Sequence, residues 1–335
     1  MPHRGFVHQG PVGVRALKGT PVSALRAIRH LALIDTSRAR CHPEIRLGDR
    51  AAMSTASVLI APDETDRGRA GSATPAPRYT LLLSTDATLV EVSQRLRHEV
   101  FVAEPGFALR SASDGLDADR FDEHCDHLLV REDVSGEVVG CYRMLPPAGA
   151  VAAGGLYSAT EFDVRPLDPL RPNLVEMGRA VVRSDHRNGA VVLLMWAGIL
   201  AYLDRCGYDY VTGCVSVPVQ GPDGDAPGVQ IRGVRDFVLR RHAAPALYTV
   251  HPYRPVIVDG KGLDHIDPPS RVTVPALMRG YLRLGAQVCG EPAHDVDFGV
   301  GDFPALLDKR RADTRYLRRL RSVEAASVVT GATAP

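Results

Sequence analysis

The apolar residues of the chain alternate over short runs and recur at helical spacing over longer ones, which together predict a mixed α/β fold. Strands are expected at residues 78–83, 126–131 and 137–145, the last two joined as a hairpin through Ser135 and Gly136. Between the first two strands, apolar side chains at 89, 92, 96 and 100 predict a helix, with Thr85 or Asp86 as its N-cap.

The same kind of pattern continues beyond the hairpin. Residues 161–164 and 174–182 predict two further strands, and residues 190–205 predict a buried helix that ends before Gly207. Another strand is expected at 208–215. The resulting order is that of a mixed central sheet flanked by helices. The longest apolar helical run lies inside the predicted buried helix and is too short to cross a bilayer.

The composition of the chain before residue 78 differs from that of the predicted core. Residues 1–77 are expected to be a disordered basic extension and linker, because the first 52 residues carry nine Lys or Arg against three acids and show no sustained period. Met53 is an alternative start of translation. Residues 78–217 form the predicted core domain.

The C-terminal half is less regular. Residues 218–321 are expected to complete the sheet and to add a helix at 275–284 and a basic helix at 309–321, whereas 322–335 are expected to be a disordered tail. Residues 218–269, rich in Pro and Gly, have no pattern that predicts particular elements.

Charge and cysteine content narrow the function classes. Forty basic and thirty-nine acidic side chains give a net charge of +1, so no global attraction to nucleic acid is expected. Six cysteines lack the spacing of a zinc site or a disulfide framework, which favours a reduced, cytoplasmic compartment. The basic helix at 309–321 predicts docking to an acidic carrier protein or peripheral contact with an anionic membrane; the alternative is a solvated terminal helix.

Acids and histidines crowd into the segment FDEHCDHLLV, residues 121–130. Three interpretations are open: a metal cluster, a solvated acidic turn, or an acceptor-binding role for Asp122 and Asp126. Residues that alternate along a strand point to opposite faces, which argues against a metal site, and we expect none. A Cys125–His124 nucleophile is disfavoured for the same reason.

A second polar group interrupts the apolar strand EMGRAVV, residues 176–182. An ionised Glu176 and Arg179 inside such a strand are costly unless they are used or satisfied. They are either a structural salt bridge or a functional pair, in which burial tunes the pKa of Glu176 for a general base or an amine anchor.

A candidate anion cradle follows this strand. It consists of Arg187, Asn188, Gly189 and Ala190, at the start of the long apolar helix. Free N–H groups and the helix dipole favour an anion at such a position, although a lone loop of this type is a weak signal.

These segments resemble known acyltransferases. EMGRAVVRSDHRNGAVVLL resembles motif A of the GNAT acyltransferases. FDEHCDHLLV, EVVGCYRMLP, YSATEFD and PALMRGYLRLGAQVCGEPAHDVDF are similar to the ornithine N-acyltransferase family of ornithine-lipid synthesis, hemolysin-like proteins that depend on acyl carrier protein. The resemblance spans residues 79–321. The acyl-homoserine-lactone synthases are a more distant likeness on the same fold.

The resemblance implies a GNAT acyl-CoA N-acyltransferase fold and a set of site residues. It implies that Glu176, Arg179 and Asp122 are catalytic, and that the acyl group and the acceptor meet a second set: Arg97, Phe101, Phe107, Asp126 and Arg143. Core packing for the two phenylalanines and a solvated helix face for Arg97 are the alternatives. The donor would lie along the backbone of Val181, Val182 and the cradle, with its thioester carbonyl polarised by backbone N–H groups near 180–182.

One departure from the family pattern bears on the donor. A GNAT cradle has small residues where this chain has Val192, and a branched side chain should obstruct a close pyrophosphate. That favours acyl carrier protein over acyl-CoA as the source of the acyl-phosphopantetheine, and no permanently bound cofactor is expected.

The resemblance therefore implies an N-acyltransferase of lipid biosynthesis that moves a (3-hydroxy)fatty acyl group from acyl carrier protein to the amine of a small, ornithine-like acceptor. Two alternatives stay open. One is a synthase of an acyl-homoserine-lactone type signal, against which the length of the C-terminal half argues. The other is a non-catalytic carrier-protein or lipid-binding module on a GNAT scaffold.

Overall fold

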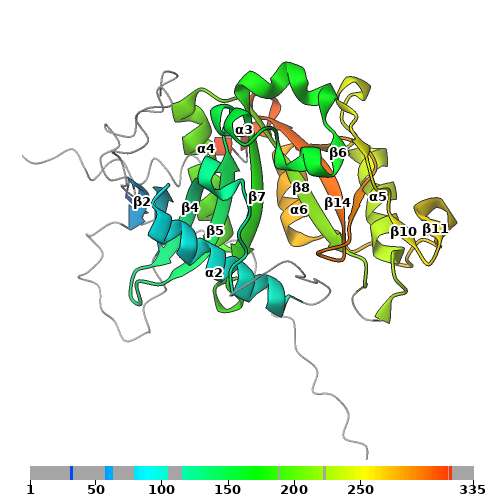
Figure 1. The fold of residues 1–335 in the computed structure, drawn as a ribbon, viewed down its shortest axis with the longest axis horizontal. Coiled ribbons are helices and arrows are strands. Elements are labelled where there is room, and N and C mark those ends of the chain that lie inside the picture. Colours follow the sequence, from blue (N-terminus) through cyan, green and yellow to red (C-terminus); the bar gives the residue numbers. More distant parts are fainter. Residues whose placement is uncertain are drawn as a thin grey trace, which may run out of the picture.

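The computed structural model describes residues 31–32, 57–62, 79–104, 115–187, 189–221, 224–315 and 317–318. Its centre is a mixed sheet in the order β1-β2-β3-β4-β5-β7-β8-β14-β12, with β13 also paired to β14 (Figure 1). The strands are β1 (Leu31–Ala32), β2 (Ser57–Pro62), β3 (Tyr79–Ser84), β4 (Asp126–Glu132), β5 (Val138–Leu145), β7 (Leu174–Val182), β8 (Tyr210–Pro218), β12 (Gln287–Val288), β13 (Ala293–Asp295) and β14 (Val300–Asp308).

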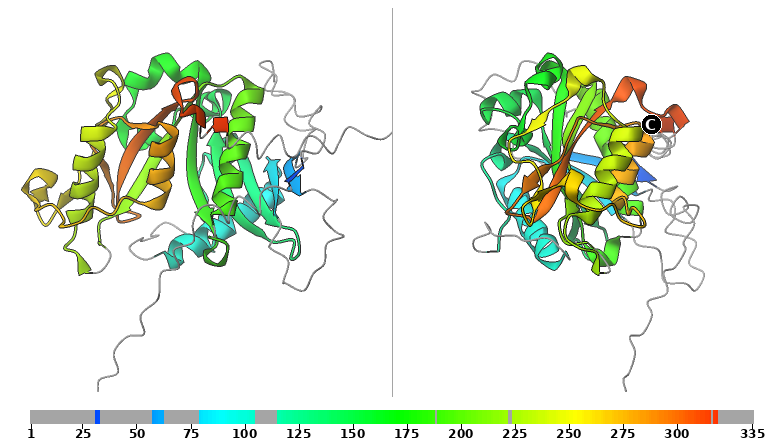
Figure 2. Two further views of the ribbon diagram at one scale, coloured as in Figure 1. Left: turned by 180° about the vertical axis from the view of Figure 1, so that it is seen from behind. Right: turned by 90° about the vertical axis from the view of Figure 1, so that its right-hand side faces the viewer.

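Helices cover both faces of this sheet. α2 (Ala87–Ala103) lies on one face, and its buried residues include Leu96 and Val100, which pack on Leu129 and Val181. α4 (Ala190–Cys206), α5 (Val229–Arg241) and α6 (Ala276–Leu284) lie on the other face, which is turned toward the viewer in the left view of Figure 2. The core between the sheet and α4 is the largest apolar cluster.

Short elements add a cap over the α2 face of the sheet. They are η3 (Asp122–His124), α3 (Pro147–Ala152), η4 (Tyr157–Thr160), β6 (Phe162–Asp163), η5 (Arg165–Asn173) and β9 (His251–Pro252). The other short elements are η6 (Ser184–His186), η8 (Ala246–Tyr248), β10 (Ile257–Val258), β11 (Lys261–Gly262), η9 (Leu263–His265) and η10 (Lys309–Arg311).

Most predicted elements have close counterparts. The expected helix after residue 86 is α2, with Asp86 accepting hydrogen bonds from the N–H groups of Thr88 and Leu89 as its N-cap. The predicted strand at 174–182 is β7, and the predicted buried helix at 190–205 is α4, which ends at Gly207 with φ 73°. The expected mixed sheet flanked by helices is confirmed.

The strand expected at 161–164 is the main correction. Its residues form only β6, which pairs with β9 in a separate small sheet instead of joining the central one. Pro166, Pro169 and Pro172 follow it in η5, and proline cannot donate to a sheet ladder.

Segments outside the predicted core also contain helices and strands. Ser57–Pro62, inside the segment expected to be disordered, pairs with β3 as β2, whereas 322–335 lies outside the described residues. The segment 218–269, which predicted nothing in particular, contains α5. In the expected basic helix at 309–321, the first residues form η10 instead, and Lys309 binds Asp204 of α4 at 2.9 Å; residues 319–321 lie outside the described part.

Across the described residues, we find no helix with the length and apolar character needed to span a membrane.

Candidate active site

β7 and β8 begin as parallel neighbours and then separate. They pair at only three positions, the last being Glu176 with Thr212. Just beyond, a Cβ on Gly213 would lie 2.3 Å from the carbonyl oxygen of Met177, so only glycine allows the two strands to touch there. From this point β7 follows β5 and β8 follows β14, which leaves the facing edges of β7 and β8 unpaired with each other. We call this the splay.

A β-bulge lies in β7 directly after the splay begins. Between the pairs Cys141–Val181 and Arg143–Gly178, β5 has one residue and β7 has two, Arg179 and Ala180. Arg179 has φ 55°, a left-handed conformation that costs a non-glycine residue about 1–3 kcal/mol. Such bulges re-aim side chains and backbone groups next to active sites.

Arg97 of α2 is buried at 1% exposure, so the alternative of a solvated helix face is wrong. Its Nε donates to Asp117 Oδ2 at 2.8 Å. Its Nη1 and Nη2 donate to the two carboxylate oxygens of Asp122 at 3.0 and 2.9 Å, a bidentate pair.

Two further arginines extend this arrangement to the splay. Arg143 Nη1 donates to Asp119 at 2.6 Å and to Asp122 at 3.1 Å. Arg179 Nε donates to Asp117 at 3.1 Å, and its Nη2 to Asp119 at 3.4 Å. Three guanidinium groups and three carboxylates thus balance one another in a largely buried space. We call them the arginine–aspartate network: Arg97, Asp117, Asp119, Asp122, Arg143 and Arg179.

Asp122 is held in its ionised form by this network. Burial alone would raise the pKa of Asp122, but hydrogen bonds and the positive charges of Arg97 and Arg143 hold it well below its usual value. Near neutral pH, Asp122 is therefore a fixed counter-ion and a poor proton acceptor.

Aromatic rings enclose Arg179. Its guanidinium carbon lies 4.9 Å from the ring centre of Tyr157 and 5.0 Å from that of Phe298. Phe298 also meets Phe101 of α2 edge to face, with ring centres 5.5 Å apart. The turn between β13 and β14 thereby contacts α2 above the bulge.

Glu176 does not pair with Arg179. Its carboxylate accepts hydrogen bonds from the backbone N–H groups at the start of η4, those of Tyr157 and Ser158, the latter at 2.8 Å. Burial raises the pKa of Glu176, although these N–H donors act in the opposite direction. Glu176 therefore holds η4 in place, and its pKa lies above that of an exposed glutamate.

The predicted anion cradle lies at the N-terminus of α4. Gly189 is its N-cap with φ 83°, and Val192 is 38% exposed in the first turn. Arg187 donates to Glu104 Oε2 at 2.6 Å and to the carbonyl of Val182 at 2.9 Å, which ties the cradle to the end of α2. Asn188 lies outside the described residues.

Not all of the predicted site residues come together. Asp126 accepts a hydrogen bond from Tyr202 of α4 at 2.7 Å, on the face opposite α2. Phe107 lies outside the described residues. Burial raises the pKa of Cys125 to about 12, which agrees with the argument against a cysteine nucleophile.

Sequence reasoning missed several residues of the site. Asp117 and Asp119 precede the acid-rich segment that was singled out, and the spacing of three aspartates over residues 117–122 was the available signal. Tyr157 gave no signal, since its role depends on the position of η4. An apolar pocket behind the splay was equally invisible; it is lined by Met177, Trp196, Val211, Thr212, Gly213, Tyr281, Ala286, Ala305 and Leu307.

Comparison with known proteins agrees with this geometry. A family model described as the acetyltransferase (GNAT) domain matches residues 96–197, from α2 through the bulge into α4. A solved CoA-dependent acyl-homoserine lactone synthase, BjaI, matches with a TM-score of 0.41 and 20% identity over 72% of this chain and 83% of that chain. The protein is a GNAT acyltransferase.

Curated relatives give the particular family. The L-ornithine N(alpha)-acyltransferase of Brucella abortus (strain 2308) is 33% identical over 249 residues, which cover 70% of this chain and 86% of that protein. The L-ornithine N(alpha)-acyltransferase of Rhizobium meliloti (strain 1021) is 32% identical over 250 residues, covering 70% and 81%. The chain belongs to the L-ornithine N(alpha)-acyltransferase family.

Proposed function

We propose that this protein transfers a fatty acyl group, 3-hydroxylated in its native form, from acyl carrier protein to the α-amine of L-ornithine in the synthesis of ornithine lipids. The acceptor rests on the names of the relatives. The observation that carries the chemistry is the bulge at Arg179 beside the splay, because it exposes backbone donors and unpaired strand edges to a thioester.

The donor would lie in the splay. The unpaired edges of β7 and β8 can bond the amide groups of a phosphopantetheine arm. Arg183 N–H donates to the carbonyl of Val139, so by strand alternation the N–H of Val182 faces away from β5 and into the splay. Val192, exposed at the cradle, favours the single phosphodiester of a carrier protein over the pyrophosphate of CoA.

The carbons of the acyl chain next to the thioester would face the small apolar pocket behind the splay. This pocket begins at Gly213, where β8 meets β7, and continues between α4 and α6. Its lining is suited to a few methylene groups.

The transfer is direct. The neutral amine attacks the thioester carbonyl, a carbon–nitrogen bond forms, and the carbon–sulfur bond breaks with release of the pantetheine thiol. N–H groups near Ala180 to Val182 stabilise the oxyanion. Glu176, through a water molecule, takes the proton that the amine loses, and this proton then passes to the departing thiolate. The arginine–aspartate network fixes the bulge that presents these donors.

The test combines the purified protein, a 3-hydroxyacyl carrier protein and a panel of amino acids, and follows thiol release and product mass. We expect N-acylated ornithine, with a lower kcat/KM for the matching acyl-CoA. Equal use of both donors would overturn the carrier-protein assignment alone. No thiol release from either donor by folded protein would overturn the proposed function and favour a binding module.

A further inference from the structure

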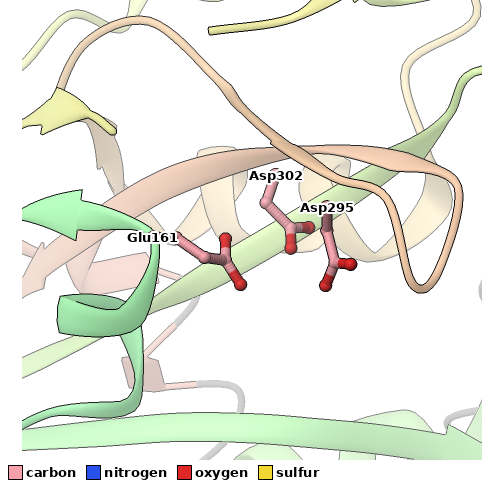
Figure 3. Close-up of side chains that lie close together, drawn as sticks. All are labelled: Glu161, Asp295 and Asp302. Atoms are coloured by element: carbon pink, nitrogen blue, oxygen red, sulfur yellow. The ribbon is translucent and has the colours of Figure 1, made fainter. Parts of the chain in front are cut away.

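Three buried acids outside the proposed catalytic residues converge on one point. Glu161, at the end of η4, points toward Asp302 of β14 and Asp295 of β13 (Figure 3). One carboxylate oxygen from each lies within 4.8 Å of the others, and the three side chains are 4%, 5% and 8% exposed. We call these residues the acidic cluster.

The cluster has no counter-ion within the described part of the chain, where none of its members forms a salt bridge. Asp302 accepts from the hydroxyl of Ser216, and Asp295 accepts from the backbone N–H groups of Asp297 and Phe298. Glu161 Oε2 is buried and has no hydrogen-bond partner among the described residues. In the free protein, Glu161 and Asp302 share a hydrogen bond, and burial together with the neighbouring acids raises the pKa of Glu161, so that a proton is held there. The orphaned oxygen is costly all the same, and a cation that replaces this proton would satisfy it.

The spacing suits an ammonium group. An alkylammonium has three N–H donors, and carboxylate acceptors about 2.8 Å from one nitrogen lie about 4.6 Å from each other. The three oxygens of the cluster all lie within 4.8 Å of one another, so a single ammonium group is small enough to contact all of them. Burial and the charge of Asp295 raise the pKa of both Glu161 and Asp302, and the charge of Arg179 acts in the opposite direction. The same charge repels a divalent ion more than a monovalent one.

The cluster is built into the walls of the proposed active site. η4 is held at its start by Glu176 and carries Glu161 at its other end. Asp295 binds the backbone of Phe298, whose ring contacts Arg179 at the bulge. The elements that carry the cluster therefore also contact Glu176 and Arg179 at the proposed active site.

We propose that the acidic cluster binds the side-chain ammonium of a diamino-acid acceptor and thereby presents the α-amine to the thioester. This inference rests on the proposed function and adds the residues that select the acceptor. It predicts that the enzyme discriminates by the terminal ammonium of the acceptor.

The experiment compares L-ornithine with L-norvaline, which lacks the terminal ammonium. We expect wild-type kcat/KM to be at least about 100-fold higher for L-ornithine. Asp302→Asn and Glu161→Gln, both nearly isosteric, should each lower kcat/KM for L-ornithine by about 10- to 100-fold and leave that for L-norvaline within a few-fold. Either variant suffices if the other fails to fold. Glu123→Gln, at an exposed acid on η3 outside the cluster, is the matched control and should change neither value.

The outcomes separate the two proposals. Wild-type turnover of L-ornithine with variants that lose both acceptors equally, or neither, would overturn the inference and leave the proposed function standing. Turnover of neither acceptor by the wild type would overturn both. Calorimetric titration with Mg²⁺ or Ca²⁺ alone forms the last arm: tight binding that Asp302→Asn abolishes would overturn the ammonium assignment in favour of a metal.

Discussion

The arginine–aspartate network and the acidic cluster flank the same bulge, and both are largely buried, but only the first contains its own counter-ions. In the network, Arg97 and Arg143 surround Asp122 and hold its pKa below the usual value. In the cluster, burial raises the pKa of Glu161 to about 9, with the charges of Asp302 and Asp295 adding to the rise.

The difference indicates a division of roles. A balanced network is complete without a ligand and can serve as rigid support for the bulge. An unbalanced cluster lowers the stability of the free protein, because its acids repel one another. A bound cation removes this repulsion, so the same acids favour binding of the acceptor. Variants of the two groups should therefore change stability in opposite directions.

The largest effect is expected in the network. Asp122→Ala leaves Arg97 and Arg143 buried without their shared partner, which should lower the free energy of unfolding by about 3–5 kcal/mol. Urea denaturation measures it. Glu91→Ala, which removes an exposed ion pair from the same helix, should change the value by less than about 0.5 kcal/mol. Equal effects of the two substitutions would contradict a buried network.

Glu176 binds the start of η4, whose other end carries Glu161 of the acidic cluster, and it is also the proposed base. Glu176→Gln replaces an oxygen that accepts a backbone N–H with an amide donor, and should cost about 2–3 kcal/mol of stability. If Glu176 is the base, kcat should fall at least about 100-fold, and the acidic limb of the pH–rate profile should disappear. A variant with full turnover would exclude the base role. A lowered kcat with an unchanged pH profile would make Glu176 a positioning residue instead.

A substitution in the acidic cluster should raise the free energy of unfolding, whereas a substitution in the network should lower it. Glu161 has its pKa raised from 4.5 to about 9 in the folded state, so folded protein keeps a proton that unfolded protein releases, and stability falls as the pH rises through this window. Glu161→Gln removes that penalty. The stability of the variant relative to wild type should therefore increase steadily from pH 5 to pH 9.

Melting temperatures of both proteins across this pH range provide the measurement. Glu123→Gln, an exposed acid on η3, serves as the control and should show no such trend. A wild-type protein that is no less stable at pH 9 than the variant would argue against a proton held in the cluster.

The smallest effect is expected at the cradle. Arg187→Ala removes an exposed ion pair with Glu104 and should change stability by less than about 1 kcal/mol. If Arg187 meets the donor phosphate, KM for the acyl carrier protein should rise several-fold, more at low salt than at high salt, with kcat unchanged. An unchanged KM at both salt concentrations would remove Arg187 from the donor site.

The sequence predicted the helices and strands of the site better than it predicted the partners of their side chains. It predicted the bounds of β7 to the residue and selected Glu176, Arg179 and Asp122. It did not predict that Glu176 binds the backbone of η4, that Asp126 lies on the opposite face with Tyr202, or that residues 161–164 leave the central sheet. Each of these depends on which strand is the neighbour and on where a ladder shifts register, which no local pattern specifies.

By itself, the sequence determined the periodic elements of this protein, because apolar spacing, an N-capping Asp86 and a terminal Gly207 act within a few residues along the chain. The family likeness was also readable there. Only the tertiary structure decided which charges balance. Glu161 lies more than a hundred residues before Asp295 and Asp302 in the sequence. The three residues meet because β14 pairs with β8 while η4 is held against β7. Burial at that meeting point, which sequence cannot measure, turns three ordinary acids into a candidate cation site.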